Sequence, residues 1–183
     1  MKVAVCDYGA GNVRSVLAAF ERLGAEASVA ETPAVIGEAD LAVLPGVGSA
    51  ASAMAVLAER GLDEALQARV AGGGATLGIC LGLQLALEQS EEDGGVTGLG
   101  LLPGRAVRLR DGRVPRIGWA PVDPGGEAYY FAHSYAAETP AVTASSEGIV
   151  AEAGAGGFVG VQFHPEKSGA AGARFLKRCL SRA

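Results

Sequence analysis

The sequence predicts an α/β fold in which an open, mostly parallel central sheet carries helices on both faces. Over the first half of the chain, short unbroken apolar runs alternate with helical patterns, as expected for parallel strands that are buried on both sides. After about residue 95 the pattern changes to successive short strands separated by turn signals such as DPGG, residues 123–126. The second half is therefore expected to add antiparallel strands.

The expected elements follow one another without a linker, a repeat or a low-complexity segment. The first half gives strands over residues 2–8, 26–30, 41–46 and 75–80, and helices over 11–24, 49–61, 62–74 and 81–90. The second half gives strands over 106–119, 128–137, 141–148, 149–154 and 157–166, and a last helix over 171–183. Residues 1–183 are expected to form a single domain.

Composition excludes several classes of function. The 183 residues are 49% hydrophobic and 19% charged, with a net charge of −5, so a nucleic-acid partner is not expected. No apolar run is long enough to cross a membrane, and no membrane partner is expected. The three cysteines have spacings that fit neither a disulfide framework nor a metal site. We expect a cytoplasmic protein that needs no metal and no cofactor.

Cys80 occupies a sharp turn in the stretch TLGICLGLQLALEQS, residues 76–90. Gly78 and Gly82 flank it between a predicted strand and a predicted helix, which is the pattern of a nucleophile elbow. Free N–H groups at the helix start would favour a thiolate, and the Leu81 N–H could form half of an oxyanion hole. The alternative is a small buried hydrophobe in a glycine-rich turn. We interpret Cys6 and Cys179, which lack such a turn, as buried hydrophobes.

A thiol nucleophile needs a base, and the chain has two histidines. His164 and Glu166 are two residues apart in an extended segment, so both side chains should point the same way, and Pro165 stiffens the pair. A carboxylate that orients the imidazole would complete a triad. The alternative is a surface His–Glu pair at a strand end. His133, in YYFAHSYAA, lacks a carboxylate two residues away and is expected in the wall of the site.

The sequence LPGVGSA, residues 44–50, forms another glycine-rich junction between a strand and a helix. Gly46 and Gly48 would let backbone N–H groups approach a ligand closely. The sequence lacks both the complete G-x-G-x-x-G pattern and the phosphate-binding G-x-x-x-x-G-K-[ST] pattern. The loop is either an ordinary turn or the source of a second oxyanion donor beside Cys80.

Taken together, these segments resemble the class-I, triad-type glutamine amidotransferases. More narrowly, they resemble the glutaminase subunits of imidazole glycerol phosphate synthase, an enzyme of histidine biosynthesis. The resemblance runs in order through DYGAGN (7–12), PGVG (45–48), GICLGLQL (78–85), VPRIGW (114–119), YFAHSY (130–135) and GVQFHPEKS (160–168). It covers essentially the whole chain and implies a flavodoxin-like sheet.

The resemblance implies a role for each matching residue. Cys80 would attack the side-chain amide of glutamine, His164 would carry the proton, and Glu166 would orient His164. The oxyanion hole would use Val47, Gly48 and Leu81, and glutamine would be held by Gly46, Gln84, Glu92, Ser134 and Tyr135. Asn12 and Trp119 would face a separate (β/α)₈-barrel cyclase subunit, forming a heterodimer that receives the ammonia.

Two residues depart from the family pattern. Arg116 stands where histidine or glutamine is usual, and Ala120 replaces the usual asparagine after Trp119, both in the segment expected to face the cyclase. Two alternatives also remain open. The chain could serve another synthase, such as anthranilate or pyridoxal phosphate synthase, although their loops usually read PGPG or PGG. It could also be an idle regulatory or redox subunit with Cys80 as a sensor.

Overall fold

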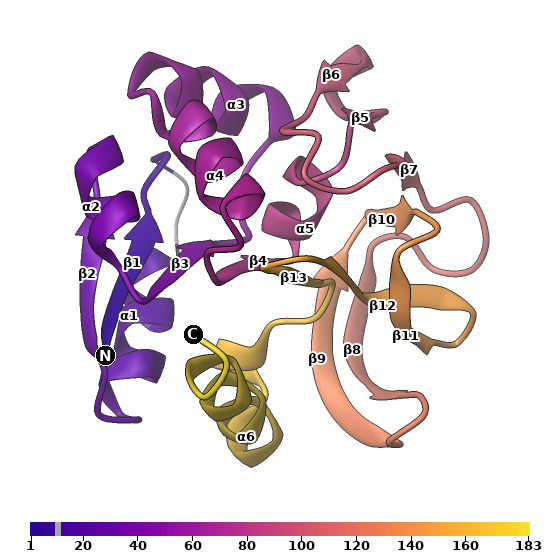
Figure 1. The fold of residues 1–183 in the computed structure, drawn as a ribbon. Coiled ribbons are helices and arrows are strands. Elements are labelled where there is room, and N and C mark those ends of the chain that lie inside the picture. Colours follow the sequence, from indigo (N-terminus) through magenta and orange to yellow (C-terminus); the bar gives the residue numbers. More distant parts are fainter. Residues whose placement is uncertain (10–11) are drawn as a thin grey trace.

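The largest sheet is open and mostly parallel. The computed structural model describes residues 1–9 and 12–183, and this sheet has seven strands in the order β11-β12-β13-β4-β3-β1-β2 (Figure 1). The strands from β13 to β2 run parallel, and β12 and β11 continue the sheet antiparallel beyond β13. The bounds are β1 (Lys2–Cys6), β2 (Glu26–Ala30), β3 (Leu41–Leu44), β4 (Thr76–Ile79), β11 (Val142–Ser146), β12 (Ile149–Ala155) and β13 (Phe158–Val161). The predicted sheet type is confirmed.

Helices cover both faces of this sheet, as predicted. Helices α1 and α6 lie on one face, and α3 and α4 on the other (Figure 1). The helices are α1 (Val13–Glu21), α2 (Pro33–Glu38), α3 (Ala50–Glu59), α4 (Leu62–Ala71), α5 (Leu81–Leu85) and α6 (Gly169–Leu180). The hairpin of β8 (Arg116–Val122) and β9 (Glu127–His133) packs on the α1 and α6 side.

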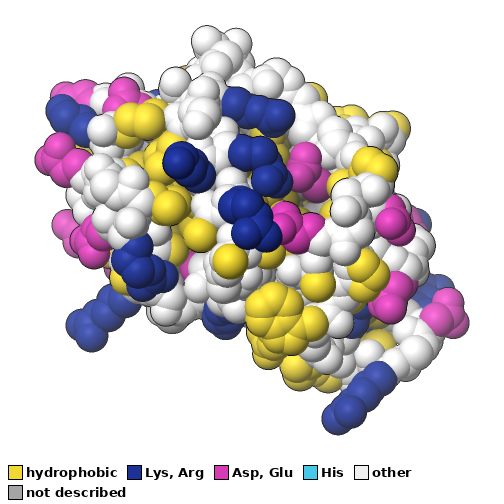
Figure 2. All heavy atoms as spheres, turned by 90° about the horizontal axis from the view of Figure 1, so that it is seen from below, with side chains coloured by type: hydrophobic (Ala, Val, Ile, Leu, Met, Phe, Trp, Pro, Cys, Tyr) yellow, Lys and Arg dark blue, Asp and Glu magenta, His cyan; other side chains and the backbone are white. Residues whose placement is uncertain are grey.

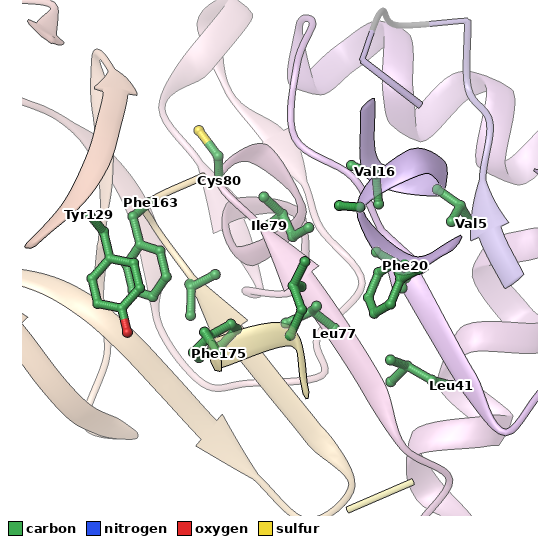
Figure 3. Packing of buried hydrophobic residues seen from close by; sticks show 14 of the residues in the cluster. Val5, Val16, Phe20, Leu41, Leu77, Ile79, Cys80, Tyr129, Phe163 and Phe175 are labelled. Carbon is green, nitrogen blue, oxygen red and sulfur yellow. The ribbon is translucent and has the colours of Figure 1, made fainter. Parts of the chain in front are cut away.

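Each face has its own apolar cluster because strand side chains alternate between the two sides. Along β1, Val3 and Val5 enter the cluster under α1 and α6, whereas Ala4 and Cys6 enter the opposite one. Figure 3 shows the first cluster, in which Cys80 stands at the end of β4 with its sulfur pointing away from the aromatic rings. The end of β4 therefore lies at the border of the core.

The predicted helix over residues 81–90 is wrong, because α5 ends at Leu85. The carbonyl groups of Leu85, Ala86 and Leu87 accept hydrogen bonds from residues 99–102 instead of from the next helical turn. The chain then enters a four-stranded sheet in the order β10-β7-β5-β6. Its strands are β5 (Gln89–Ser90), β6 (Val96–Thr97), β7 (Arg105–Arg108) and β10 (Tyr135–Glu138), with the 3-10 turn η1 (Glu92–Gly94) between β5 and β6.

Three further boundaries differ from the sequence prediction. The expected strand 106–119 is divided between β7 and β8, which belong to different sheets, and 128–137 is divided at Ser134 into β9 and β10. The expected strand 157–166 ends at Val161 and is followed by the 3-10 turn η2 (Pro165–Lys167). Helix α2, which has a proline at its first position, was not predicted. The predicted first helix began at Gly11, which lies outside the described residues.

Lysine and arginine side chains gather on the face seen in Figure 2, the lower side in Figure 1, where α6 lies. The exposed side of α6 carries Arg174, Lys177 and Arg178, while Phe175 and Leu176 of the same helix are buried. Helix α6 is thus amphipathic, with a cationic outer side. Among the described residues, no helix combines the length and apolar character that crossing a membrane would need.

The start of α5 packs directly against β3, and this contact requires glycine at position 82. A Cβ atom built on Gly82 would lie 2.0 Å from the Leu44 carbonyl oxygen. We predict that Gly82→Ala lowers the free energy of unfolding by about 3 kcal/mol or more, because backbone atoms must move apart. Urea denaturation of the variant and the unchanged protein measures the difference.

Gly37→Ala is the matched control, because Gly37 also lies in a helix but has no atom within 4 Å of an added Cβ. Its expected effect is within about 0.5 kcal/mol. Equal stability of the two variants would contradict the assigned contact between α5 and β3.

Candidate functional site

Cys80 forms the turn between β4 and α5 in a conformation that L-residues rarely adopt. Its backbone has φ 49° and ψ −101°, a conformation that costs on the order of 1–3 kcal/mol and that surrounding contacts must offset. The Cys80 N–H donates to the Val161 carbonyl at 2.6 Å, and the Cys80 carbonyl accepts from the N–H of Leu83 at 3.1 Å. These contacts hold the thiol at the carboxyl end of β4, as expected for an elbow.

The glycine-rich loop at residues 45–48 touches this turn. A Cβ atom on Gly46 would come within 2.0 Å of the Ile79 carbonyl oxygen and 2.7 Å of the Cys80 Cβ atom, so only glycine fits. The Tyr8 hydroxyl, which is buried, donates a hydrogen bond to the Pro45 carbonyl and ties the loop to the segment after β1. The loop and the thiol are thereby held side by side.

His164 and Glu166 come together as their spacing suggested. The His164 Nδ1 atom lies 2.9 Å from Glu166 Oε1, and both side chains are 1% exposed. The Asn12 Nδ2 atom donates to the same carboxylate oxygen at 2.5 Å. Asn12 was expected to face the partner subunit; its contact with Glu166 joins residues 154 positions apart and leaves no local pattern in the sequence.

The surroundings of His164 favour its protonated form. Burial is the largest single effect and lowers the pKa, but hydrogen bonds and charges from Cys80 and Glu166 outweigh it and raise the pKa to about 9. Among the described residues, the Nε2 atom of His164 has no partner within normal hydrogen-bond distance. The Cys80 thiol is nevertheless close enough to raise the pKa of the imidazole. The His164 imidazole can therefore accept the proton of the Cys80 thiol and keep it.

His133 has the opposite character. Its Nδ1 atom lies 2.8 Å from the Tyr135 carbonyl oxygen, which can only accept, so Nδ1 carries the proton. Burial, and to a lesser extent the charges of Arg116 and His164, lower the pKa of His133 to about 4. His133 is therefore a neutral residue in the wall of the site, as expected from the absence of a neighbouring carboxylate.

A cavity of about 290 Å³ opens beside the Cys80 sulfur. Its wall contains every residue that was expected in the oxyanion hole or at the substrate, namely Gly46, Val47, Gly48, Leu81, Gln84, Glu92, Ser134 and Tyr135. Within the described residues, no acceptor pairs with the N–H groups of Val47, Gly48 or Leu81. The cavity thus brings a thiol together with residues whose backbone N–H groups have no partner among the described residues, a combination that suits acyl transfer.

Glu92 lies on η1, beyond the end of α5. Its Oε2 atom accepts from the Ala50 N–H at 3.0 Å, and Asp93 accepts from the Ala51 N–H at 3.1 Å, so both acids cap the start of α3. Burial raises the pKa of Glu92. The Glu92 carboxylate therefore both caps α3 and lines the cavity.

The sequence also matches known proteins over almost its full length. A family model described as glutamine amidotransferase class-I matches residues 4–183. The chain belongs to the class-I glutamine amidotransferase family. The predicted family is confirmed.

Several relatives carry the name imidazole glycerol phosphate synthase subunit HisH. The amidotransferase is 42% identical to the protein of Symbiobacterium thermophilum, with 96% of this chain and 91% of the relative covered. It is also 42% identical to the proteins of Methanothermobacter thermautotrophicus and Thermus thermophilus, with 96% of this chain covered in each case and 96% and 95% of the relatives.

A solved structure described as a glutamine amidotransferase shares the fold. Its TM-score is 0.82 at 21% identity, and the match covers 98% of this chain and 97% of the other. The structure of PurLQS from Thermotoga maritima has a TM-score of 0.77 at 18% identity, with 98% and 97% covered. The arrangement of sheets in this amidotransferase is therefore that of glutamine amidotransferases.

The two departures from the family pattern turn inward. The Arg116 guanidinium lies 4.2 Å from the centre of the Phe131 ring, and its Nη2 atom donates to Glu147 at 2.9 Å and to Ser146 at 2.8 Å. Ala120 is buried at 8% exposure. The segment that contains them was expected to face the cyclase, and this stays a prediction. Strand alternation along β8 turns these two side chains to the inner side of the hairpin.

Ile117 and Trp119 are the outward-facing residues of the same strand, with exposures of 63% and 58%. Ile117 also lines the mouth of the Cys80 cavity. The two side chains form an exposed apolar pair on the outer side of β8. The expected role of Trp119 at a partner interface stays a prediction.

Gln162 was not among the expected site residues, yet its buried amide lies against the Cys80 sulfur. In the stretch VQF it looks like an ordinary strand residue, so only its place in the family motif could have singled it out.

Within residues 1–9 and 12–183, no cluster of three or more His, Cys, Asp or Glu side chains could hold a metal ion.

The low pKa of His133 should make the folded protein less stable in acid. Because the folded-state pKa of about 4 lies below the ordinary 6.5, the unfolded chain binds the proton first, so stability is present above pH 6.5 and falls toward pH 4. We predict that acidification from pH 7 to 4.5 destabilises the wild-type protein by about 2–3 kcal/mol more than it destabilises His133→Gln. Urea denaturation at both pH values measures this difference, and equal losses would contradict the assigned tautomer and burial.

Proposed function

We propose that this chain is the glutaminase subunit of imidazole glycerol phosphate synthase in histidine biosynthesis. It hydrolyses glutamine to glutamate and ammonia. The ammonia passes to a separate (β/α)₈-barrel cyclase subunit, which makes imidazole glycerol phosphate and aminoimidazole carboxamide ribotide. The observation that carries the proposal is the Cys80 thiol held at a strained turn beside the buried His164–Glu166 pair. The names of the relatives support the particular synthase.

In this mechanism Cys80 acts as the nucleophile. His164 takes the thiol proton, and the sulfur attacks the side-chain amide carbon of glutamine. Glu166 accepts a hydrogen bond from Nδ1 of His164 and so keeps Nε2 toward the sulfur. The imidazolium then gives its proton to the departing ammonia, leaving a γ-glutamyl thioester. Water adds to the thioester with His164 as base, and glutamate leaves.

Backbone N–H groups stabilise the negative oxygen that forms in both steps. The Leu81 N–H follows directly after the nucleophile, and Val47 and Gly48, whose N–H groups are the other proposed donors, line the same cavity. Because the loop contacts the Cys80 turn through Gly46, a small rotation of one loop peptide changes the donor set without moving the thiol. We propose that the partner controls this rotation.

The cavity has groups for both ends of a free amino acid. Glu92 supplies a carboxylate for the ammonium group, and the Gln84 amide nitrogen donates to the Tyr135 carbonyl at 2.8 Å, which leaves its oxygen for the substrate. Ser134 stands at the break between β9 and β10, with its side chain in the cavity wall. These contacts would orient the side-chain amide of glutamine toward Cys80.

The exposed pair of Ile117 and Trp119 supports a partner site at the cavity mouth. We propose that the cyclase covers this pair in a cytoplasmic heterodimer, so that ammonia leaves the cavity into the partner and not into solvent. The Trp119 ring packs edge-on against Tyr130, with ring centres 6.2 Å apart, which holds the exposed side of the indole in place.

Replacing the nucleophile tests the mechanism. We predict that Cys80→Ala, reconstituted with the cyclase, lowers glutamine hydrolysis by at least about 10³-fold, because no thioester can form. Glutamate release measures the loss. Cys179→Ala is the control, since Cys179 lies on α6 away from the cavity and should leave turnover unchanged. Unchanged turnover in Cys80→Ala would refute the assignment.

Complementation tests the choice of synthase. We expect the gene for this chain to restore growth without histidine to a bacterial strain that lacks its own glutaminase subunit but retains the matching cyclase. The Cys80→Ala gene should not do so. Failure here, together with rescue of a strain deficient in anthranilate or pyridoxal phosphate synthesis, would overturn the assignment.

A further inference from the structure

A buried amide lies against the sulfur of Cys80. The Gln162 Nε2 atom is 3.4 Å from Cys80 Sγ, and the Gln162 side chain is completely buried. Gln162 follows the last residue of β13, and its own N–H is fixed by a hydrogen bond to the Ala151 carbonyl at 2.9 Å. The backbone that presents the amide is therefore held by the central sheet.

The direction of this contact is set by a chain of hydrogen bonds that begins at a carbonyl group. The Tyr135 carbonyl oxygen can only accept, and it lies 2.8 Å from the Gln84 side chain, so Gln84 must turn its nitrogen toward it. The same nitrogen lies 3.2 Å from the Gln162 side chain, which must therefore present its oxygen there. This leaves the Gln162 nitrogen, and not its oxygen, on the side of the sulfur.

His133 is a second donor to the Tyr135 carbonyl oxygen. Its Nδ1 atom donates to the Tyr135 carbonyl, so this oxygen receives two donors and polarises both. Turning the Gln84 amide around would place its oxygen against the Tyr135 carbonyl oxygen, and turning the Gln162 amide around would place two N–H donors against each other. Either change leaves buried polar groups unpaired, which costs more than a normal hydrogen bond gives. The network has one low-energy orientation.

We propose that Gln162 is a catalytic residue that donates a hydrogen bond to the sulfur of Cys80 and stabilises it as a thiolate. Gln84 and the Tyr135 carbonyl act as positioning groups for that donor. The inference rests on Cys80 as the nucleophile. The contribution of Gln162 is distinct from that of His164, because an amide donates a hydrogen bond without giving up its proton.

The donor acts at both ends of the reaction. Before attack it stabilises the negative sulfur that remains when His164 has taken the proton. In hydrolysis, water adds to the thioester carbon and loses a proton to His164. The carbon–sulfur bond then breaks, and its electron pair returns to sulfur. The Gln162 amide stabilises this leaving thiolate, and no further co-reactant is needed.

Alkylation of Cys80 by iodoacetamide as a function of pH tests the proposal, because the thiolate is the reacting form. Cys6 and Cys179 have pKa values raised by burial to about 12, so the reaction at neutral pH reports on Cys80, and peptide mass analysis verifies the site. The charged or titratable groups around the sulfur are His164 and Tyr8, with His133 and Glu92 in the cavity wall. The variants below leave all of them in place.

Two variants and one control separate a catalytic role from a structural one. We expect Gln162→Met to move the alkylation midpoint upward by about one pH unit, which is about a tenfold slower reaction at a pH well below the midpoint, and Gln162→Glu to move it further. Thr76→Val removes another buried side-chain hydrogen bond, the one to the Gly74 carbonyl, and should leave the midpoint unchanged. A lower thermal midpoint of unfolding with an unchanged alkylation profile in both Gln162 variants would overturn the proposal.

A measurement on the wild-type protein covers the case in which neither variant folds. The side-chain amide signals of Gln162 in a ¹H–¹⁵N spectrum should shift with the same pH midpoint as Cys80 alkylation, and signals that stay constant through that range would overturn the proposal. Failure of the glutaminase assignment is distinguishable, because it would appear as turnover that survives in Cys80→Ala while the alkylation results stand.

Discussion

The backbone turn at Cys80 is the constraint on which the rest of the site depends. A residue with φ 49° cannot continue β4 as a strand, so its side chain leaves the sheet at the carboxyl edge. The turn fits only because glycine at positions 46, 78 and 82 lets three backbone segments pass within a distance that excludes a Cβ atom. The loop at residues 45–48, α5 and the sulfur are therefore placed by one packing arrangement.

The two histidines show how the same side chain takes opposite roles within one site. Both are buried, and burial lowers the pKa of each. His164 has a carboxylate and a thiol as neighbours, which reverse the effect, whereas His133 has a carbonyl oxygen and the nearby charge of Arg116, which do not. One ring is suited to carry a proton and the other to remain neutral in the wall.

Much of the fold follows from patterns that are local in the sequence. Apolar runs predicted the parallel strands, and the two-residue spacing of His164 and Glu166 predicted that they meet. The helix over 81–90 failed because residues 99–102 take the carbonyl groups that a longer helix would need. The contacts of Asn12 with Glu166 and of Gln162 with Cys80 join distant positions, 154 and 82 residues apart, and no local pattern encodes them.

Direct detection of the γ-glutamyl thioester tests the central claim that the turn exists to present a nucleophile. The complex of this chain with the cyclase is mixed with isotopically labelled glutamine, and the reaction is stopped in acid during turnover. The protein is then digested and its peptides are analysed by mass spectrometry. The account predicts a labelled glutamyl group on the peptide that contains Cys80, removable by hydroxylamine and absent from Cys80→Ala. Turnover without label on that peptide, or with label on another residue, would contradict it.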